Sequence, residues 1–291
     1  MIKKKLSINA EKIDKFLIRF LKKQGHSELS QPMKYGVVAG GKKIRSTVIF
    51  DTGKMLNINE KKLINICAAV ECVHSYSLIH DDLPCMDNDA IRRGKPSTHI
   101  KYGEASAVLA GSSLLTLAFE IIADKKYKLN SKLKNEIIEY LANCSGHTGI
   151  AGGQELDLKF ENKNKKINKI IDMQKKKTGK LFNFCLYAVG VVANKSREEL
   201  FFLSNLGEQI GLLFQLSDDF LDIKSSKKLA GKPVKKDKKK GKSTLLNLMG
   251  EKKAYKYAFN LKKKILLKLK KHGKKAKSLT NTIEFILGRN F

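Results

Sequence analysis

HDDLPCMDND, residues 80–89, places four aspartates within nine positions. They are Asp81, Asp82, Asp87 and Asp89. Carboxylates this close together repel one another, so the cluster predicts a cationic or metal counterion. Pro84 blocks a regular helix across the stretch, and in an unbroken helix Asp87 would lie about 240° around from Asp81. We therefore expect a buried helix that ends near Asp82, followed by a loop that brings Asp87 back beside Asp81.

A second acidic cluster lies far downstream, in the stretch FQLSDDFLD at residues 214–222. Asp218 and Asp222 are four apart and share a helix face, with Asp219 about 100° away. Either cluster alone could be a solvated helix end, but two clusters that each follow an apolar run favour a shared function. Carboxylates suit Mg²⁺, which completes its shell with water and substrate phosphates. Our hypothesis is that the two clusters face each other across a polyphosphate ligand.

The composition favours one all-α domain that covers residues 1–291. The chain has 42% hydrophobic residues and only four prolines, all in polar or glycine-containing stretches, so little interrupts long helices. We find no convincing strand pattern, and Gly207 and Gly211 indicate close helix packing. A glycine-containing turn is expected at 36–41, and a mobile, solvated loop at 224–242. Helices are expected at 8–23, 42–56, 60–82, 104–123, 132–144, 167–177, 178–193, 198–224, 243–272 and 279–287.

The formal charge of +30, from 58 basic and 28 acidic residues, raises nucleic acid or an anionic membrane as a partner. The basic residues are mostly lysines spread over every segment. They lack the interleaved aromatic and arginine side chains that stacking or base readout would use. Drift toward A/T-rich codons would leave the same composition. We therefore expect no nucleic acid partner.

Cysteine usage and hydropathy point to a cytoplasmic protein. The five cysteines are an odd number without a C-x-x-C pair, which favours a reducing compartment and disfavours a zinc site. The first residues lack the apolar core of a signal peptide. The longest uncharged runs fall short of the roughly 20 residues that a bilayer span requires. We expect no integral membrane association.

Cations that suit phosphate accompany the acidic clusters. Arginine is scarce in this chain, so Arg45 and the pair Arg92-Arg93 stand out, and the guanidinium fork binds phosphate in bidentate fashion. His74 lies two turns before Asp81 on an apolar helix, where a core histidine and a phosphate donor are both open interpretations.

The motifs together resemble the trans-isoprenyl diphosphate synthases, most closely the bacterial farnesyl diphosphate synthases. The similarity runs from about Gly36 to Arg289. The resemblance implies an isoprenoid-synthase-type helical bundle around a central active-site cavity, three Mg²⁺ ions with bound diphosphate, and a homodimer. Its most specific pieces are GGKKIR at 40–45, the stretch 71–94, GGQELDL at 152–158, KTG at 177–179, the stretch 214–222 and GKST at 241–244.

The resemblance also implies roles for individual residues. Metal ligands would be Asp81, Asp82, Asp87, Asp218 and Asp222, with Asp219 completing the second motif. The catalytic set would be Asp81, Asp82, Lys177 and Asp218. Isopentenyl diphosphate would be held by Lys42, Arg45, His74 and Arg93. The allylic diphosphate would be held by Arg92, Lys177, Thr178, Gln215, Lys232 and Lys242.

The expected reaction is condensation of isopentenyl diphosphate with dimethylallyl and geranyl diphosphate to give farnesyl diphosphate. The allylic diphosphate ionises, the alkene attacks, and a proton is lost. Tyr76 and Ser77, five and four residues before Asp81, would set the product length, although Tyr76 also fits a core position. Alternatives are a geranylgeranyl or longer-chain diphosphate synthase, and a non-catalytic helical binding subunit.

Overall fold

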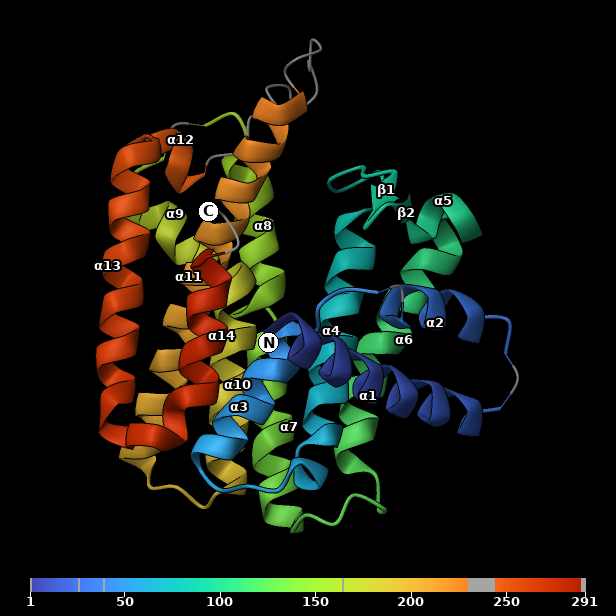
Figure 1. Ribbon diagram of the computed structural model, residues 1–291. Coiled ribbons are helices and arrows are strands. Elements are labelled where there is room, and N and C mark those ends of the chain that lie inside the picture. Colours follow the sequence, from blue (N-terminus) through green and yellow to red (C-terminus); the bar gives the residue numbers. More distant parts are fainter. Residues whose placement is uncertain (1, 26, 39, 164, 230–243, 289–291) are drawn as a thin grey trace. The chain divides into compact units, whose positions relative to one another are not determined.

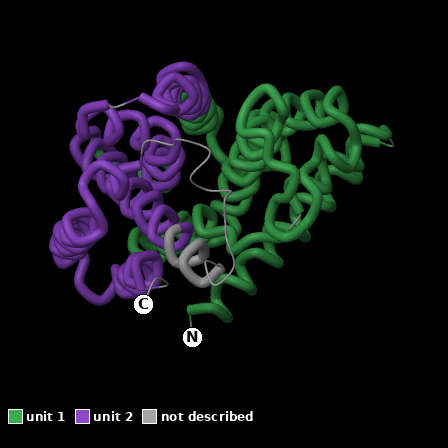
Figure 2. The backbone as a smooth tube through the Cα atoms, turned by 90° about the horizontal axis from the view of Figure 1, so that it is seen from above, with its two compact units in different colours: residues 1–142, 188–196 green, residues 143–187, 197–291 purple. Residues whose placement is uncertain are grey.

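The computed structural model describes residues 2–25, 27–38, 40–163, 165–229 and 244–288, with the backbone alone for 223–229. These residues are almost entirely helical, which confirms the all-α prediction (Figure 1). They divide into two compact units, which Figure 2 shows in separate colours: Met1–Ala142 with Ala188–Ser196, and Asn143–Tyr187 with Arg197–Phe291. The single-domain interpretation stays a prediction.

Unit 1 is built around α4 (Ile64–Asp81), which is buried along most of its length because it is apolar on nearly every side. Glycines let neighbouring helices approach its last turn. A Cβ at Gly36 of α2 would overlap Ile79, and one at Gly111 of α6 would overlap the His80 ring. The other elements of the unit are α1 (Ile2–Lys23), α2 (Ser30–Val38), α3 (Ile44–Met55), η1 (Glu60–Lys62), β1 (Ile91–Arg92), β2 (Lys95–Pro96), α5 (Thr98–Tyr102), α6 (Glu104–Ala123) and most of α7 (Ser131–Ser145).

Unit 2 is built around α11 (Arg197–Leu229), which contacts α9, η2, α12, α13 and α14. Gly211 confirms the predicted close packing, because a Cβ there would lie 2.7 Å from the Cα of Gly179. The other elements are α8 (Ile150–Phe160), α9 (Ile167–Gln174), η2 (Lys175–Gly179), the first part of α10 (Lys180–Val192), α12 (Leu245–Met249), α13 (Glu251–Leu269), η4 (Lys270–Ala276) and α14 (Lys277–Gly288).

Several local predictions were wrong. Residues 30–38 form α2, so the expected turn at 36–41 begins only after Val38. The segment expected to be a loop from 224 onward continues as helix α11 to Leu229, and 230–242 lie outside the described residues. A short hairpin pairs Ile91 with Pro96, because Arg93 and Gly94 both take the positive φ of a tight two-residue turn.

Among the described residues, one helix, α6, is long and apolar enough to cross a membrane by length and composition. Within its most apolar window, 44% of the residues are buried against the rest of the chain. A core helix of a soluble protein passes the same test, so α6 is weak evidence for a membrane span.

Candidate active site

The first aspartate cluster forms the loop that the sequence predicts. α4 ends at Asp81, and the backbone N–H of Asp87 then donates to the carbonyl of Asp81 at 2.8 Å. The N–H of Asp89 donates to the carbonyl of Asp82 at 3.2 Å. The break at Pro84 therefore brings both ends of the cluster together within unit 1.

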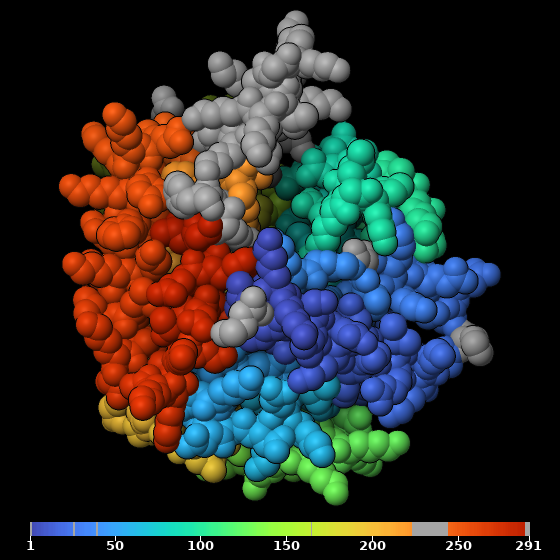
Figure 3. All heavy atoms as spheres, viewed as in Figure 1, coloured from blue at the N-terminus to red at the C-terminus, as the bar shows by residue number. Residues whose placement is uncertain are grey.

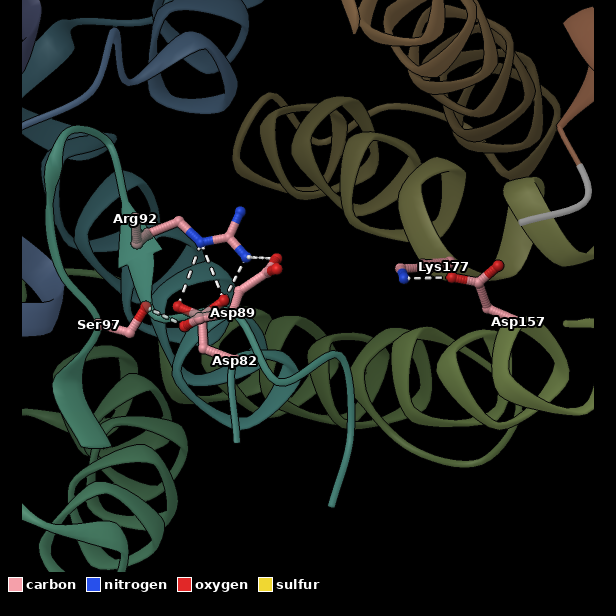
Figure 4. A network of polar contacts seen from close by, with 6 residues as sticks. All are labelled: Asp82, Asp89, Arg92, Ser97, Asp157 and Lys177. Atoms are coloured by element: carbon pink, nitrogen blue, oxygen red, sulfur yellow. Dashed lines mark hydrogen bonds and ion pairs between the residues drawn. The ribbon is translucent and has the colours of Figure 1, made fainter. Parts of the chain in front are cut away.

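Arg92 neutralises the centre of this cluster. Its Nε donates to both carboxylate oxygens of Asp82, at 3.0 and 3.1 Å, and its Nη2 also bonds Asp82. The same Nη2 lies 3.3 Å from Asp89 (Figure 4). Ser97 supports the loop by donating to the carbonyl of Asp89. The structure thus brings together the predicted ligand Asp82 and the predicted phosphate-binding residue Arg92.

A basic group surrounds His74 in the same unit. Burial lowers the pKa of His74 well below its ordinary value, and the charges of Arg45, Arg93 and Lys43 lower it further. Three of the four residues predicted to bind isopentenyl diphosphate, Arg45, His74 and Arg93, therefore lie close enough for the two arginines to lower the pKa of the histidine. The fourth, Lys42, is exposed and lies three residues before Arg45 in the sequence.

The side chain of Arg93 packs against the glycine turn, Gly40-Gly41, that precedes α3. Its Nη1 donates to the carbonyl of Gly40 at 2.6 Å, and a Cβ at Gly41 would lie 2.7 Å from its Cζ. Gly40 and Gly41 both have positive φ, so the turn and the close approach each require glycine. This contact explains why GG precedes the predicted binding residues.

Lys43, which the sequence analysis gave no role, is buried beneath this turn. Its Nζ donates to the carbonyl of Val37 at 2.6 Å and lies 3.4 Å from Asp14 and 3.9 Å from Glu71. Ser46 donates to Glu71 at 2.8 Å. This ionic network ties α1, α3 and α4 together beside Arg45.

Tyr76 and Ser77 lie on the last turns of α4, as predicted. The Tyr76 ring packs edge-to-face on His80, with centroids 5.0 Å apart. Burial, and then the charge of Asp81, raises the pKa of Tyr76, which places the phenol near the first cluster. Ser77 donates instead to the carbonyl of His74 at 2.9 Å.

In unit 2, the predicted residues Lys177 and Thr178 lie on η2, a π-helical turn between α9 and α10. Lys177 Nζ bonds Asp157 Oδ2 of α8 at 2.6 Å (Figure 4). A Cβ at Gly153 would overlap the backbone N of Lys177, so only glycine lets α8 approach this turn. π-Helical turns inside α-helices are frequent at functional sites.

A chain of side-chain hydrogen bonds joins this turn to the second aspartate cluster. Thr178 donates to Gln215 at 2.8 Å, and Gln215 donates to Asp219 Oδ1 at 2.9 Å. Gln174 donates to the other oxygen of Asp219 at 3.3 Å. Burial raises the pKa of Asp219 to about 7, although the bond from Gln215 opposes the shift.

The three aspartates of α11 therefore differ in role. Asp219 is buried between two amides, whereas Asp218 is half-buried and Asp222 is exposed. Asp218 and Asp222 are thus the members of this cluster that a ligand reaches from solvent. Gln174 and Asp157 are functional candidates that the sequence analysis missed, and the predicted residues Lys232 and Lys242 lie outside the described residues.

The donor set fits Mg²⁺ that is shared with phosphate. Among the described residues, no three His, Cys, Asp or Glu side chains gather closely enough to enclose a metal ion by themselves. Mg²⁺ usually takes one or two carboxylates and completes its shell with water and substrate phosphate. The aspartates of each cluster can supply that number of oxygens.

Comparison with known proteins identifies the family. The profile of the polyprenyl synthetase family matches residues 26–283. The chain belongs to this family. It is 38% identical to the farnesyl diphosphate synthase of Escherichia coli over 265 residues, which cover 89% of each chain. The predicted resemblance is thereby confirmed.

Solved structures of similar proteins share the fold along nearly the whole chain. An FPP/GFPP synthase from Zymomonas mobilis is 33% identical with a TM-score of 0.85, covering 97% of this chain and 99% of that one. A geranyltransferase from Helicobacter pylori, complexed with magnesium and isoprenyl diphosphate, is 31% identical with a TM-score of 0.80. That match covers 99% of this chain and 96% of the other. The predicted isoprenoid-synthase-type fold is confirmed.

Proposed function

We infer that this polyprenyl synthetase is a farnesyl diphosphate synthase. It condenses isopentenyl diphosphate with dimethylallyl diphosphate and then with geranyl diphosphate. The observation that carries this function is a pair of aspartate clusters, each with cationic or amide side chains built beside it. Asp82 is bonded by Arg92, and Asp219 is linked through Gln215 to the turn that carries Lys177. The farnesyl diphosphate synthase of Escherichia coli, at 38% identity, supports the product.

Residues of unit 1 bind isopentenyl diphosphate in this proposal. Arg45, Arg93 and Lys42 supply positive charge, and His74 donates a hydrogen bond as a neutral imidazole because its pKa is lowered. Neutral His74 avoids a further buried charge beside the two arginines. The alkene of this substrate attacks the allylic cation, and the departing pyrophosphate is the acceptor of the proton that is lost.

The residues that we propose for the allylic diphosphate are Arg92, Lys177, Thr178 and Gln215, with Lys232 and Lys242 as further candidates. Three Mg²⁺ ions would be held with the diphosphate by Asp81, Asp82, Asp87, Asp218 and Asp222. Bound Mg²⁺ stabilises the negative charge that develops on the leaving pyrophosphate. The relative from Helicobacter pylori, solved with magnesium and isoprenyl diphosphate, supports magnesium and a prenyl diphosphate as the ligands of this site.

A homodimer in the cytoplasm completes the proposal. Val108 and Leu109 of α6 are 43% and 56% exposed, and Ile100 of the adjoining α5 is 55% exposed, so these two elements carry large apolar side chains that a second copy can cover. Light scattering after size exclusion should give twice the chain mass. Leu109→Glu should dissociate the dimer, whereas Lys125→Glu, at an exposed position beyond α6, should not. A wild-type chain that elutes as a monomer would disprove this state.

The deciding experiment is incubation with labelled isopentenyl diphosphate and dimethylallyl diphosphate, with and without Mg²⁺, followed by product sizing. We expect fifteen-carbon product with Mg²⁺ only. Asp82→Asn should lower the rate at least about a hundredfold, and Asp124→Asn, in a turn after α6, should not. Products of twenty carbons or more would favour the longer-chain alternative, to which the FPP/GFPP synthase relative points. No Mg²⁺-dependent elongation at all would leave only a binding role.

A further inference from the structure

Helix α13 turns one face into unit 2 and the other to solvent. Its buried side chains pack toward α11, α12 and α14; they are Ala254, Ala258, Ile265 and Leu269. The side chains of α13 (orange) lie on the surface in Figure 3. The side chains on the other face are exposed, although the Tyr255 ring also packs edge-to-face on Phe220 of α11.

This outward face is strongly basic. Lys256 and Lys263 are exposed and seven residues apart, and Lys270, the C-cap residue of α13 at the start of η4, is exposed seven residues further on, so the three follow one line along the helix axis. The sequence has no acidic residue from Lys252 to Lys277. Further exposed lysines flank this line, at Lys252, Lys253, Lys264 and Lys271.

Large apolar side chains are set among these lysines. Phe259 is 46% exposed and Leu267 is 51% exposed. Phe259, Lys263 and Leu267 follow one another at four-residue spacing, so they lie on the same face of the helix. Tyr255, 37% exposed, stacks beside Phe259 with centroids 6.5 Å apart. The expectation that the lysines lack interleaved aromatic side chains is therefore wrong for this helix.

We propose that the outward face of α13 docks on the surface of an anionic lipid bilayer. Lysines near such a surface each contribute about fivefold in binding, and the contribution is screened by salt. Aromatic and aliphatic side chains between them can enter the headgroup layer, as on interfacial amphipathic helices. Lysine stems extend past the apolar side chains and keep their charges in water.

The combination favours a membrane over nucleic acid. An exposed leucine on the helix has no stacking partner on a nucleic acid, and the face has no arginine for base or phosphate forks. Codon drift accounts for lysines everywhere on the chain, but it does not account for exposed Phe259 and Leu267 on the lysine line. None of the lysines and apolar residues of this face is assigned to prenyl transfer, so vesicle binding and prenyl transfer can be tested independently.

Sedimentation with vesicles tests the docking. The full-length protein should bind vesicles of phosphatidylcholine mixed with phosphatidylglycerol and not phosphatidylcholine alone, and added salt should weaken binding. The triple variant Lys256→Gln, Lys263→Gln, Lys270→Gln should bind at least about tenfold more weakly. Lys125→Gln, Lys128→Gln, Lys132→Gln removes the same charge at exposed positions near α7, and should keep most of the binding.

A tryptophan probe locates the contact, because the natural chain has no Trp. Phe259→Trp should show a blue-shifted emission on anionic vesicles, whereas Phe201→Trp, at a 71% exposed position on α11, should not. No vesicle binding, an equal loss in both triple variants, or equal emission behaviour of the two probes would overturn the proposal. Binding to double-stranded DNA that α13 lysines control, without vesicle binding, would assign the face to nucleic acid instead.

Discussion

The side-chain amide of Gln174 donates a hydrogen bond to Oδ2 of Asp219 at 3.3 Å, while Gln215 bonds the other carboxylate oxygen at 2.9 Å. Two amides from different elements, α9 and α11, therefore fix the orientation of this buried carboxylate. Its neighbours Asp218 and Asp222 extend from the same turns of α11. The orientation of the second cluster thus depends on a residue outside the aspartate motif.

Gln174→Ala should lower kcat/KM about tenfold and raise the Mg²⁺ concentration needed for half-maximal rate. The reason is the loss of one of the two hydrogen bonds that orient the buried Asp219 carboxyl, worth about 0.5–1.5 kcal/mol. Steady-state kinetics with an Mg²⁺ titration measures both. Gln209→Ala, which removes a half-buried amide of α11 that bonds Lys268 at 3.2 Å, is the matched control. Equal Mg²⁺ requirements in wild type and Gln174→Ala would show that the bond is incidental.

Gly153→Ala should distort the π-helical turn, because its Cβ would overlap the backbone of Lys177. Overpacking of this kind costs about 1–3 kcal/mol, and the displaced Lys177 should lower kcat further than the stability loss explains. Urea unfolding and kinetics on the same samples separate the two effects. Gly288→Ala, where nothing lies within 4 Å of the added Cβ, should change neither.

The sequence predicted the parts of the site that local rules determine. Pro84 limits the helix before it, so the return of Asp87 to Asp81 could be expected, and the four-residue spacing of Asp218 and Asp222 fixed their common face. Gln174 and Asp157 carry no such signal, because their pairing with Asp219 and Lys177 depends on how separate helices pack.

The missed elements have similar physical reasons. The predicted helices 167–177 and 178–193 meet inside the π-helical turn at Lys175–Gly179, but helical periodicity does not indicate that this turn is π-helical. The glycines at 36–41 made the end of α2 resemble a turn, although Gly36 lies inside the helix and provides room for Ile79. Glycine spacing alone does not distinguish close packing from a turn.

Lys43→Met should lower the free energy of unfolding by about 3 kcal/mol. The substitution leaves Glu71 buried without its cation, and removing one partner of a buried pair is more costly than removing both. Lys43 is 2% exposed in its side chain, whereas the adjacent Lys42 is exposed, so Lys42→Met is the control and should change stability by less than about 0.5 kcal/mol. Partial recovery in Lys43→Met with Glu71→Gln would locate the cost in the unpaired carboxylate.

His74 should make stability depend on pH below its ordinary pKa of 6.5. The folded state keeps the ring neutral, because burial and then Arg45 and Arg93 lower its pKa, while the unfolded chain binds a proton. Proton binding therefore stabilises the unfolded state as the pH falls. The contribution of His74 should lower the free energy of unfolding by about 1 kcal/mol between pH 7.5 and 5.5. The free energy of unfolding, measured with urea at several pH values, should change less steeply with pH in His74→Gln than in wild type. In His147→Gln, at an exposed position, it should change with pH as in wild type. Parallel slopes for His74→Gln and wild type would contradict the lowered pKa.

Tyr76→Ala should lengthen the products. Tyr76 lies five residues before Asp81 on α4, and its ring packs on His80. A prenyl chain that grows from the first aspartate cluster would extend along this helix. Removing the ring would open space there, so twenty-carbon or longer diphosphates should join the fifteen-carbon product when products are sized chromatographically. Tyr102→Ala, which removes a ring that packs on Tyr35 instead, is the control for loss of an aromatic side chain in the same unit. A product spectrum of Tyr76→Ala identical to that of wild type would remove Tyr76 as the residue that limits chain length.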